Sequence, residues 1–185
     1  MVTIRNYQER DEEAVRCICL GSSFGERMDE KIRDAIVEVY CRYYIEHEPE
    51  NCFVAVDGAD EPKGYILCAE RYDVWKQVFF ESYVDGSQNP AVPMMAQGTM
   101  SAMQPYAQEY PAHLHIDLLP ECQGQGVGTK LVETLTGHLR RRGAAGLMLN
   151  VANDNERAIR FYGKCGFCVL GHTGQETAYG MRLLP

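Results

Sequence analysis

The sequence contains 185 residues, of which 45% are hydrophobic, and its formal net charge is -8. This length is enough for one domain with a sizeable core and too short for two, so residues 1–185 are expected to form a single domain. The negative charge argues against general nucleic-acid binding and fits a neutral or cationic small substrate, although surface acidity also serves solubility. No run approaches the ~18 apolar residues of a membrane span, and the N-terminus lacks an apolar signal core, so we expect a cytoplasmic protein without a membrane partner.

Eight cysteines could suggest a disulfide scaffold. Several occupy apolar positions of predicted strands and helices, where cysteine behaves as a small hydrophobic residue, so we expect reduced thiols. The segment Cys165-x2-Cys168-x3-His172 has the spacing of half a metal site. A zinc ion needs four ligands, or three and a water, and nothing else in the sequence pairs with this segment. Core thiols and no bound metal are therefore expected.

Apolar periodicity and turn residues divide the first half of the chain into short elements. Acidic residues suit the first turn of the first helix, a stretch rich in glycine and serine at 21–25 breaks that helix, and Asp29 is placed to cap the second. The predicted elements are a strand at 2–7, helices at 11–20 and 29–46, strands at 52–56 and 64–69 joined as a hairpin, and a helix at 72–83.

The segment 85–111 has four prolines, four methionines and no convincing periodicity. It is expected to be a long loop insertion, and a loop of this length inside a compact domain is usually functional or disordered. Its methionines could form a pliable lid over a substrate or a contact between two copies of the chain, as in a homodimer. The sequence leaves both readings open.

The stretch 113–142 predicts a strand, a glycine-rich turn and a helix. Residues 113–118 alternate between polar and apolar, as in a strand with two unlike faces, and Pro120 ends the ladder. In the turn at 123–128 every second residue is a glycine, which has no side chain to block an anion. An anion could therefore approach the unpaired N–H groups at the start of the following helix, which is the positive end of its dipole. No carboxylate occurs in that helix before Glu133, so the turn predicts a phosphate cradle.

The glycine spacing excludes two common nucleotide motifs. Gly124, Gly126 and Gly128 follow GxGxG rather than GxGxxG, and no acidic residue ends the next predicted strand, at 146–151, to hold a ribose. The Walker spacing is also absent. A helix at 155–164 and a closing pair of strands at 167–171 and 177–184 complete the chain.

Two motifs together resemble those of the GNAT N-acetyltransferases. Gln123-x-x-Gly126-x-Gly128 resembles the family's pyrophosphate loop, and Asn155-x-x-Ala158-Ile159-x-Phe161-Tyr162-x-x-x-Gly166-Phe167 resembles its second signature. They occur in the family's order and cover about a third of the chain. The resemblance implies an α/β (α+β) fold whose central sheet is mixed, mostly antiparallel and about seven strands wide. Helices would flank the sheet, which would splay between strands 4 and 5.

The resemblance also implies acetyl-CoA as co-substrate. Its pantetheine arm would lie along the strand at 116–118, where the N–H of Leu118 would polarise the thioester carbonyl. The helices before the first hairpin border the acceptor in this family, so Phe24 and Tyr43 or Tyr44 are candidates for the substrate wall, with core packing as the alternative. The implied cofactor-binding residues are Ile116, Asp117, Leu118, Gln123, Gly124, Gln125, Gly126, Val127, Gly128, Thr129, Asn155 and Tyr162.

Tyr162 matches the family's general acid, because a phenol with a pKa of ~10 is protonated at pH 7 and can donate to a departing thiolate. Some relatives have a glutamate at the position of Asn150, and an amide cannot accept a proton. Candidate bases are therefore His115, which has a suitable ordinary pKa, and Asp117, after burial or through a water. Structural roles for both remain as alternatives.

These residues favour an N-acetyltransferase that moves an acetyl group directly from acetyl-CoA to a primary amine of a small molecule or peptide. The alternative is a non-catalytic acyl-CoA-binding module that senses or scaffolds. Tyr110-Pro111 leading into His115-x-Asp117 also loosely resembles the acetyltransferase-like domain of animal O-GlcNAcases and its stand-alone bacterial relatives. The animal domains lack the glycine-rich loop that is intact here, so an active enzyme is expected.

Overall fold

The computed structural model describes residues 2–23 and 29–184. Within these residues seven strands form one mixed sheet in the order β1-β2-β3-β4-β5-β7-β6. Every neighbouring pair is antiparallel except β4 and β5. The strands are β1 (Thr3–Asn6), β2 (Phe53–Val56), β3 (Pro62–Ala69), β4 (Ala112–Leu118), β5 (Gly146–Ala152), β6 (Cys168–His172) and β7 (Glu176–Arg182). The predicted sheet is confirmed.

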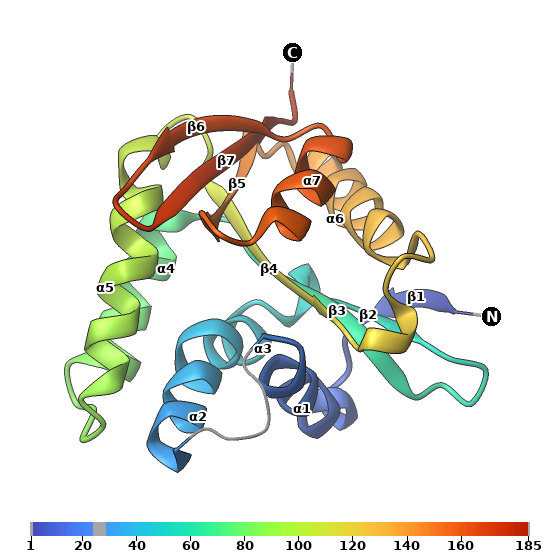
Figure 1. Cartoon of the computed structure of the whole chain (residues 1–185), viewed down its shortest axis with the longest axis horizontal. Coiled ribbons are helices and arrows are strands. Elements are labelled where there is room, and N and C mark those ends of the chain that lie inside the picture. The colour runs from blue at the N-terminus through green and yellow to red at the C-terminus, as the bar shows by residue number, and fades with distance from the viewer. Residues whose placement is uncertain (1, 24–28, 185) are drawn as a thin grey trace.

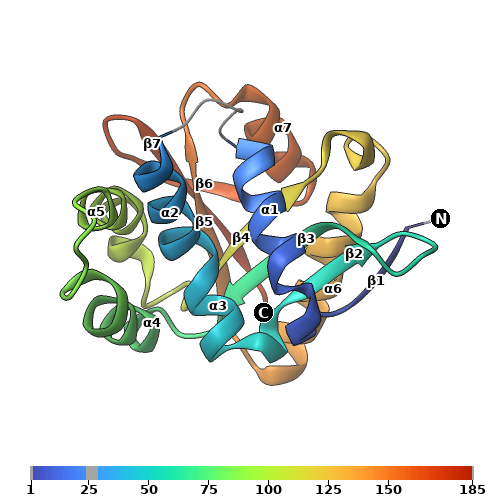
Figure 2. The same cartoon turned by 90° about the horizontal axis from the view of Figure 1, so that it is seen from below.

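Helices cover both faces of this sheet (Figures 1 and 2). The helices α1 to α5 pack on one face and α6 and α7 on the other, and a separate hydrophobic cluster fills each side. The helices are α1 (Glu12–Ser23), α2 (Glu30–Val37), α3 (Tyr43–His47), α4 (Tyr72–Phe79), α5 (Ala91–Met103), α6 (Val127–Arg142) and α7 (Glu156–Lys164). None of the described helices is long and apolar enough to cross a membrane.

The sheet separates into two arms between β4 and β5. These strands pair only where Ala112 meets Leu147 and His113 meets Met148. Beyond that point β4 continues along β3, while β5 remains paired with β7 over its whole length. The predicted splay between strands 4 and 5 is confirmed, and Figure 1 shows β4 leaving the upper arm to join the lower one.

The predicted second helix is continuous but contains a wide turn. Asp29 caps it as expected, because its carboxylate accepts a hydrogen bond from the N–H of Lys31 at 2.9 Å. Between α2 and α3 the turn η2 (Glu38–Arg42) is a π-helix. Such turns are often found at functional sites, and apolar periodicity does not reveal them.

Two sequence predictions of irregular structure were wrong. The loop expected at 85–111 contains α5, which packs against β5 and β7. Pro90 and Pro93 lie at the start of α5, where a missing N–H costs no helical hydrogen bond, and Met100 and Met103 are buried. The break expected at 21–25 was also placed too early, because α1 continues through Gly21.

All eight cysteines are free thiols, but they are not all in the core. Cys165 is half-buried at the end of α7, and Cys168 is exposed on β6. The expectation that this pair are core thiols was therefore wrong for Cys168, because β6 is an edge strand with an exposed face.

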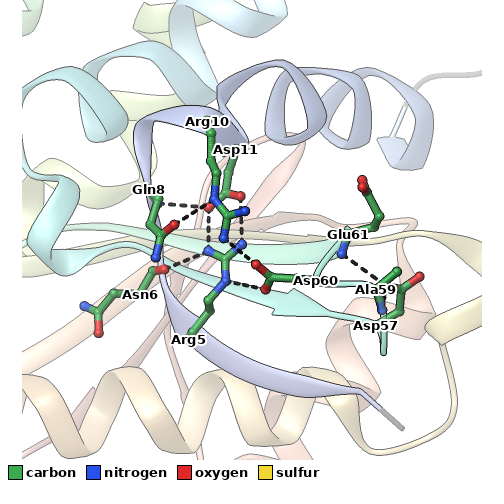
Figure 3. A network of polar contacts seen from close by, with 9 residues as sticks. All are labelled: Arg5, Asn6, Gln8, Arg10, Asp11, Asp57, Ala59, Asp60 and Glu61. Atoms are coloured by element: carbon green, nitrogen blue, oxygen red, sulfur yellow. Dashed lines mark hydrogen bonds and ion pairs between the residues drawn. The ribbon is translucent and has the colours of Figure 1, made fainter.

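A polar network fixes the N-terminal strand to its neighbours (Figure 3). The Arg5 guanidinium donates two hydrogen bonds to the buried Asp11 carboxylate, at 2.6 and 2.9 Å, and a third to Asp60 at 2.8 Å. Arg10 also pairs with Asp60. This fork-shaped pairing connects β1 and the turn that precedes α1 to the β2–β3 hairpin, on the arm of the sheet that ends at β4.

Candidate active site

A cleft of about 1140 Å³ opens where β4 and β5 separate. Residues from both faces of the sheet line it, because consecutive β4 side chains alternate between the faces and all of 113–118 contribute. The glycine turn and α7 border it on one face, and η2 and α5 on the other. The cleft thus has two halves, which we call the α7 half and the α5 half.

The free edge of β4 offers backbone groups to this cleft. β4 stays in register with β3 from His113 to Leu118, and the N–H of Leu119 donates to the carbonyl of Lys63 at 2.9 Å. Backbone groups along an antiparallel ladder alternate between two directions. Those of Ile116 and Leu118 therefore point away from β3, into the gap left by β5. An extended ligand in this gap would pair with β4 like an added strand.

The glycine turn presents the start of α6 to the α7 half. Gly124 and Gly126 have φ angles of 76° and 78°, the left-handed region that glycine adopts without strain. The first intrahelical hydrogen bond runs from Lys130 N–H to the Gly126 carbonyl, so the N–H groups of 127–129 precede it. The first turn of α6 contains no acidic residue. This geometry suits a diphosphate, and binding of phosphate here stays a prediction.

The side chains of three predicted cofactor residues have other contacts. Gln123 donates through Nε2 to the Leu118 carbonyl at 2.8 Å, and Gln125 donates to the carbonyl of Glu121. Val127 is buried in the core beneath α6. The Gln123 side chain connects the turn to the end of β4. Because the side chains of the turn make these contacts, the groups left to bind an anion are the backbone N–H groups.

The start of α7 forms the outer wall of the α7 half. Asn155 is its N-cap, since its side chain accepts a hydrogen bond from Ala158 N–H at 3.0 Å, and it also lines the cleft. Charged side chains of this segment reach the cleft, and most are basic: Asp154, Arg157, Arg160 and Lys164. Arg160 also pairs with Glu156 at 2.9 Å, but the basic side chains that line this wall outnumber the acidic one, which suits the negative charge of a polyphosphate.

Tyr162 lies on α7 and faces the cleft from within an aromatic cluster. Its ring packs against Phe161, Phe167 and Tyr179, and only 8% of the residue is exposed. Burial raises the pKa of the Tyr162 phenol, and the Asp117 carboxylate adds to the rise. The phenol is therefore protonated at neutral pH, which is the state that a proton donor needs.

His115 and Asp117 are brought together on β4 by Tyr65. The Tyr65 hydroxyl donates to Asp117 Oδ2 at 2.8 Å and lies 3.1 Å from His115 Nδ1. Because that hydroxyl proton goes to Asp117, Nδ1 is the donor to Tyr65 and Nε2 carries the lone pair. The His115 ring stacks on Tyr40 with centroids 5.1 Å apart. Burial lowers the pKa of His115 against the opposing effect of Asp117, so the ring is neutral near pH 7.

Cys19 on α1 completes this cluster. Ligand atoms of Cys19, His115 and Asp117 all lie within 4.8 Å of one another, so the three could hold a metal ion. Burial raises the pKa of the Cys19 thiol to about 12, which opposes formation of the thiolate that a metal would bind. No sequence pattern indicates this cluster, since Cys19 is distant along the chain and has no ligand-type spacing to β4.

The α5 half has a wall that the sequence indicated only in part. Tyr44 lines the cleft, whereas Tyr43 lies in the core, stacked on His47 and edge-on to Trp75, and Phe24 lies outside the described residues. Sequence reasoning missed three lining residues, Tyr40, Thr99 and Glu176, whereas Met103, which also lines the cleft, is one of the methionines expected as a lid over a substrate. The hydroxyl of Thr99 donates to that of Tyr40 at 3.1 Å, which joins α5 to the π-turn.

His113 lies at the closed end of the cleft. It is 1% exposed and contacts the rings of Tyr44, Tyr72 and Trp75, and neither ring nitrogen has a hydrogen-bond partner among the described residues. Burial lowers the pKa of His113 to about 3, so it is neutral in the folded protein.

Known proteins share this architecture. The family model described as the acetyltransferase (GNAT) family matches residues 13–167. Among curated proteins, N-alpha-acetyltransferase 30 of Schizosaccharomyces pombe is 29% identical over 127 residues, which are 69% of this chain and 63% of that protein. The uncharacterized N-acetyltransferase YobR of Bacillus subtilis is 30% identical over 131 residues, 68% of this chain and 49% of that one. The matches thus span less than two thirds of these relatives' own lengths.

Solved structures match over the whole chain. The crystal structure of SsHAT has a TM-score of 0.85 and 28% sequence identity, and covers 100% of this chain and 99% of its own. The PaiA N-acetyltransferase from Thermoplasma acidophilum, solved in complex with coenzyme A, has a TM-score of 0.65 at 16% identity and shares the fold over 98% of this chain and 99% of its own. The family match includes the glycine turn, Asn155 and Tyr162, and the chain therefore belongs to the GNAT family of acetyltransferases.

Proposed function

We propose that the protein transfers the acetyl group of acetyl-CoA directly to a primary amine of a small molecule or a peptide. The observation that carries this proposal is the free edge of β4, which ends beside the glycine turn. One continuous surface therefore offers strand-like pairing to an extended arm and helix N–H groups to a diphosphate. That combination fits acetyl-CoA, which is both extended and anionic.

The residues of the α7 half would bind this co-substrate. N–H groups at 126–129 would hold its diphosphate, with the basic residues of α7 nearby. Backbone groups of Ile116 and Leu118 would pair with the pantetheine arm, and the Leu118 N–H would stabilise the oxyanion that forms on the thioester carbonyl. Asn155 would contribute mainly by fixing the start of α7.

Tyr162 would supply the proton for the departing thiolate. Its raised pKa keeps the phenol protonated at neutral pH, and the phenol would donate this proton to the sulfur as the C–S bond breaks. On the acceptor side His115 and Asp117 face the cleft from β4, where His115 is 23% and Asp117 13% exposed. Either could receive a proton from the amine, His115 through Nε2 and Asp117 through its carboxylate.

Amine-dependent thiol release tests this function. The purified protein would be given acetyl-CoA and a panel of primary amines (putrescine, benzylamine, glucosamine and a tetrapeptide with a free N-terminus), with a thiol reagent reporting free CoA. We expect release that depends on both the protein and one of the amines, with the acetylated amine found by mass spectrometry. If acetyl-CoA binds by calorimetry but no amine increases thiol release above the rate of hydrolysis, the protein is an acyl-CoA-binding module instead.

A further inference from the structure

Glu176, at the start of β7, is a carboxylate in the cleft to which the GNAT motifs assign no role. Its side chain is half-buried and lines the cleft. The Asn150 amide donates to its Oε2 at 2.6 Å. No described residue makes a hydrogen bond to the second oxygen, Oε1, which leaves that oxygen for a ligand.

The register of the second arm places this carboxylate opposite β4. Asn150 pairs with Ala178, and Ala152 pairs with Glu176, so Asn150 and Glu176 are diagonal neighbours on one face of the sheet. Met148 lies on the same face of β5 and belongs to the core cluster beneath α1 to α5. Glu176 therefore belongs to the α5 half, on the face where β4 presents His115 and Asp117.

Charge separates the two halves of the cleft. The α5 half has two carboxylates, Asp117 on β4 and Glu176 on β7, and among the residues that the structure describes the Arg and Lys side chains lining the cleft come from α7. Two carboxylates on facing arms attract a cation and disfavour an anion. Most alkylamines are protonated at neutral pH, with a pKa near that of lysine, ~10.4. They must lose one proton before the nitrogen can attack.

We propose that the α5 half binds the ammonium form of the acceptor and that Glu176, held by Asn150, is the base that removes its proton. This inference rests on the proposed acetyl transfer. Glu176 Oε1 takes one proton from the ammonium, and the freed nitrogen lone pair attacks the thioester carbonyl carbon. The C–S bond then breaks, Tyr162 donates its proton to the sulfur, and the second proton of the nitrogen restores the phenol. The proton on Glu176 leaves to solvent, so each turnover releases one proton.

The surroundings of Glu176 make its carboxylate a better proton acceptor than an exposed glutamate. Burial raises its pKa, and the hydrogen bond from Asn150 lowers it in part. Its position also explains why an amide at residue 150 need not abolish catalysis, since the carboxylate reaches the cleft from the adjacent strand. Titratable or charged groups that face this region are Tyr40 from η2, His115 and Asp117 from β4, Asp154 before α7 and Tyr162 from α7; α5 contributes the uncharged Thr99 and Met103.

Three variants test the inference by the pH dependence of kcat/KM, with the panel amine that wild type acetylates fastest. Glu176→Gln keeps the shape of the side chain and an oxygen that accepts from the Asn150 amide, but it removes the base. We therefore expect kcat/KM to fall at least about 100-fold. The decline of kcat/KM at low pH that is attributable to Glu176 should also disappear. Asn150→Ala removes the hydrogen bond that lowers the pKa of Glu176, so the acidic limb should move to higher pH. The matched control is Glu13→Gln, which removes an exposed carboxylate of α1 away from the cleft.

Acetyl-CoA affinity, measured by calorimetry, should be the same in all four proteins, which shows that each is folded. Wild-type turnover together with an unchanged Glu176→Gln profile would overturn this inference and leave the proposed function standing. If the low-pH limb of the kcat/KM profile of Asn150→Ala lies at the same pH as in wild type, Asn150 does not have the positioning role. Absence of wild-type turnover with every amine would contradict the proposed function, and this inference with it.

Discussion

The two halves of the cleft are built from different parts of the chain. The α7 half uses the edge of β4, the glycine turn and α7, which follow one another between residues 112 and 164. The α5 half brings together side chains from η2, α5, β4 and β7, whose positions run from Tyr40 to Glu176. One half is thus largely a backbone site within a continuous segment. The other is a side-chain site that exists only once the chain has folded.

This difference has a physical basis. Backbone N–H groups are available at every helix start, so a binding site for phosphate needs only glycines to expose them and a strand to aim them. An amine needs carboxylates and ring walls of defined shape, and these come from whichever elements the fold places nearby. The α7 half should therefore tolerate changes of side chain that leave its backbone intact, whereas the α5 half should respond to single side-chain atoms.

Tyr162→Phe should have the largest effect and should separate chemistry from binding. If the phenol protonates the thiolate, removal of its oxygen should slow acetyl transfer by about 10²–10⁴-fold while the ring still packs. Affinity for acetyl-CoA should not change. Tyr179→Phe is the matched control, since Tyr179 stacks on Tyr162 in the same cluster but does not line the cleft. Full turnover in Tyr162→Phe, measured in single-turnover experiments, would remove it as the acid.

Gly126→Glu should weaken acetyl-CoA binding by about 100-fold, equivalent to ~2.7 kcal/mol. The change puts a carboxylate at the start of α6 and also forces a side chain into the left-handed region, where φ is 78°. Gly126→Ala introduces that backbone strain without the charge, so the difference between the two variants measures the electrostatic part. Calorimetry on both variants gives the comparison. Equal affinities would show that the diphosphate binds elsewhere.

The sequence revealed the α7 half far better than the α5 half. The alternation at 113–118 and the glycine spacing predicted β4, the turn and α6, because each pattern is local and repeats at the period of its element. Glu176 and Cys19 carry no such pattern, because strand register brings Glu176 to the cleft and helix packing brings Cys19 to His115 and Asp117. The prediction of a loop at 85–111, where α5 lies, was wrong for another reason. The four prolines at 85–111 were interpreted as loop residues, although Pro90 and Pro93 lie at the N-terminal end of a helix that is stabilised by packing on β5 and β7.

The closed end of the α5 half should make the protein sensitive to acid. Burial lowers the pKa of His113 in the folded protein to about 3, below the ordinary value of 6.5. Between these two values the unfolded chain binds a proton at this residue and the folded protein does not. Stability should fall as pH drops below ~6.5 at ~1.4 kcal/mol per unit, a loss of ~2 kcal/mol by pH 5, and should level off near the folded pKa. His113→Leu should remove this contribution.

Urea unfolding of wild type and His113→Leu at pH 7.5, 6 and 5 measures the effect. The control is His172→Gln, which replaces an exposed histidine on β6 and should keep the wild-type pH slope. If the free energy of unfolding changes with pH equally in wild type and His113→Leu, protonated His113 must have a partner in the folded protein.

Thr99→Val should have the smallest effect and is the most direct test of whether α5 belongs to the acceptor side. The change keeps the shape of the side chain and removes the hydroxyl that donates to Tyr40 at 3.1 Å. A hydrogen bond of this kind contributes ~0.5–1.5 kcal/mol, so KM for the amine should rise by roughly 2- to 13-fold, with acetyl-CoA affinity unchanged. Ser101→Ala serves as the control, because Ser101 is exposed on α5 and its hydroxyl bonds to the helix's own Gly98 carbonyl. If instead KM rises for acetyl-CoA and not for the amine, α5 contributes to the co-substrate site. The division of the cleft into two halves would then be wrong.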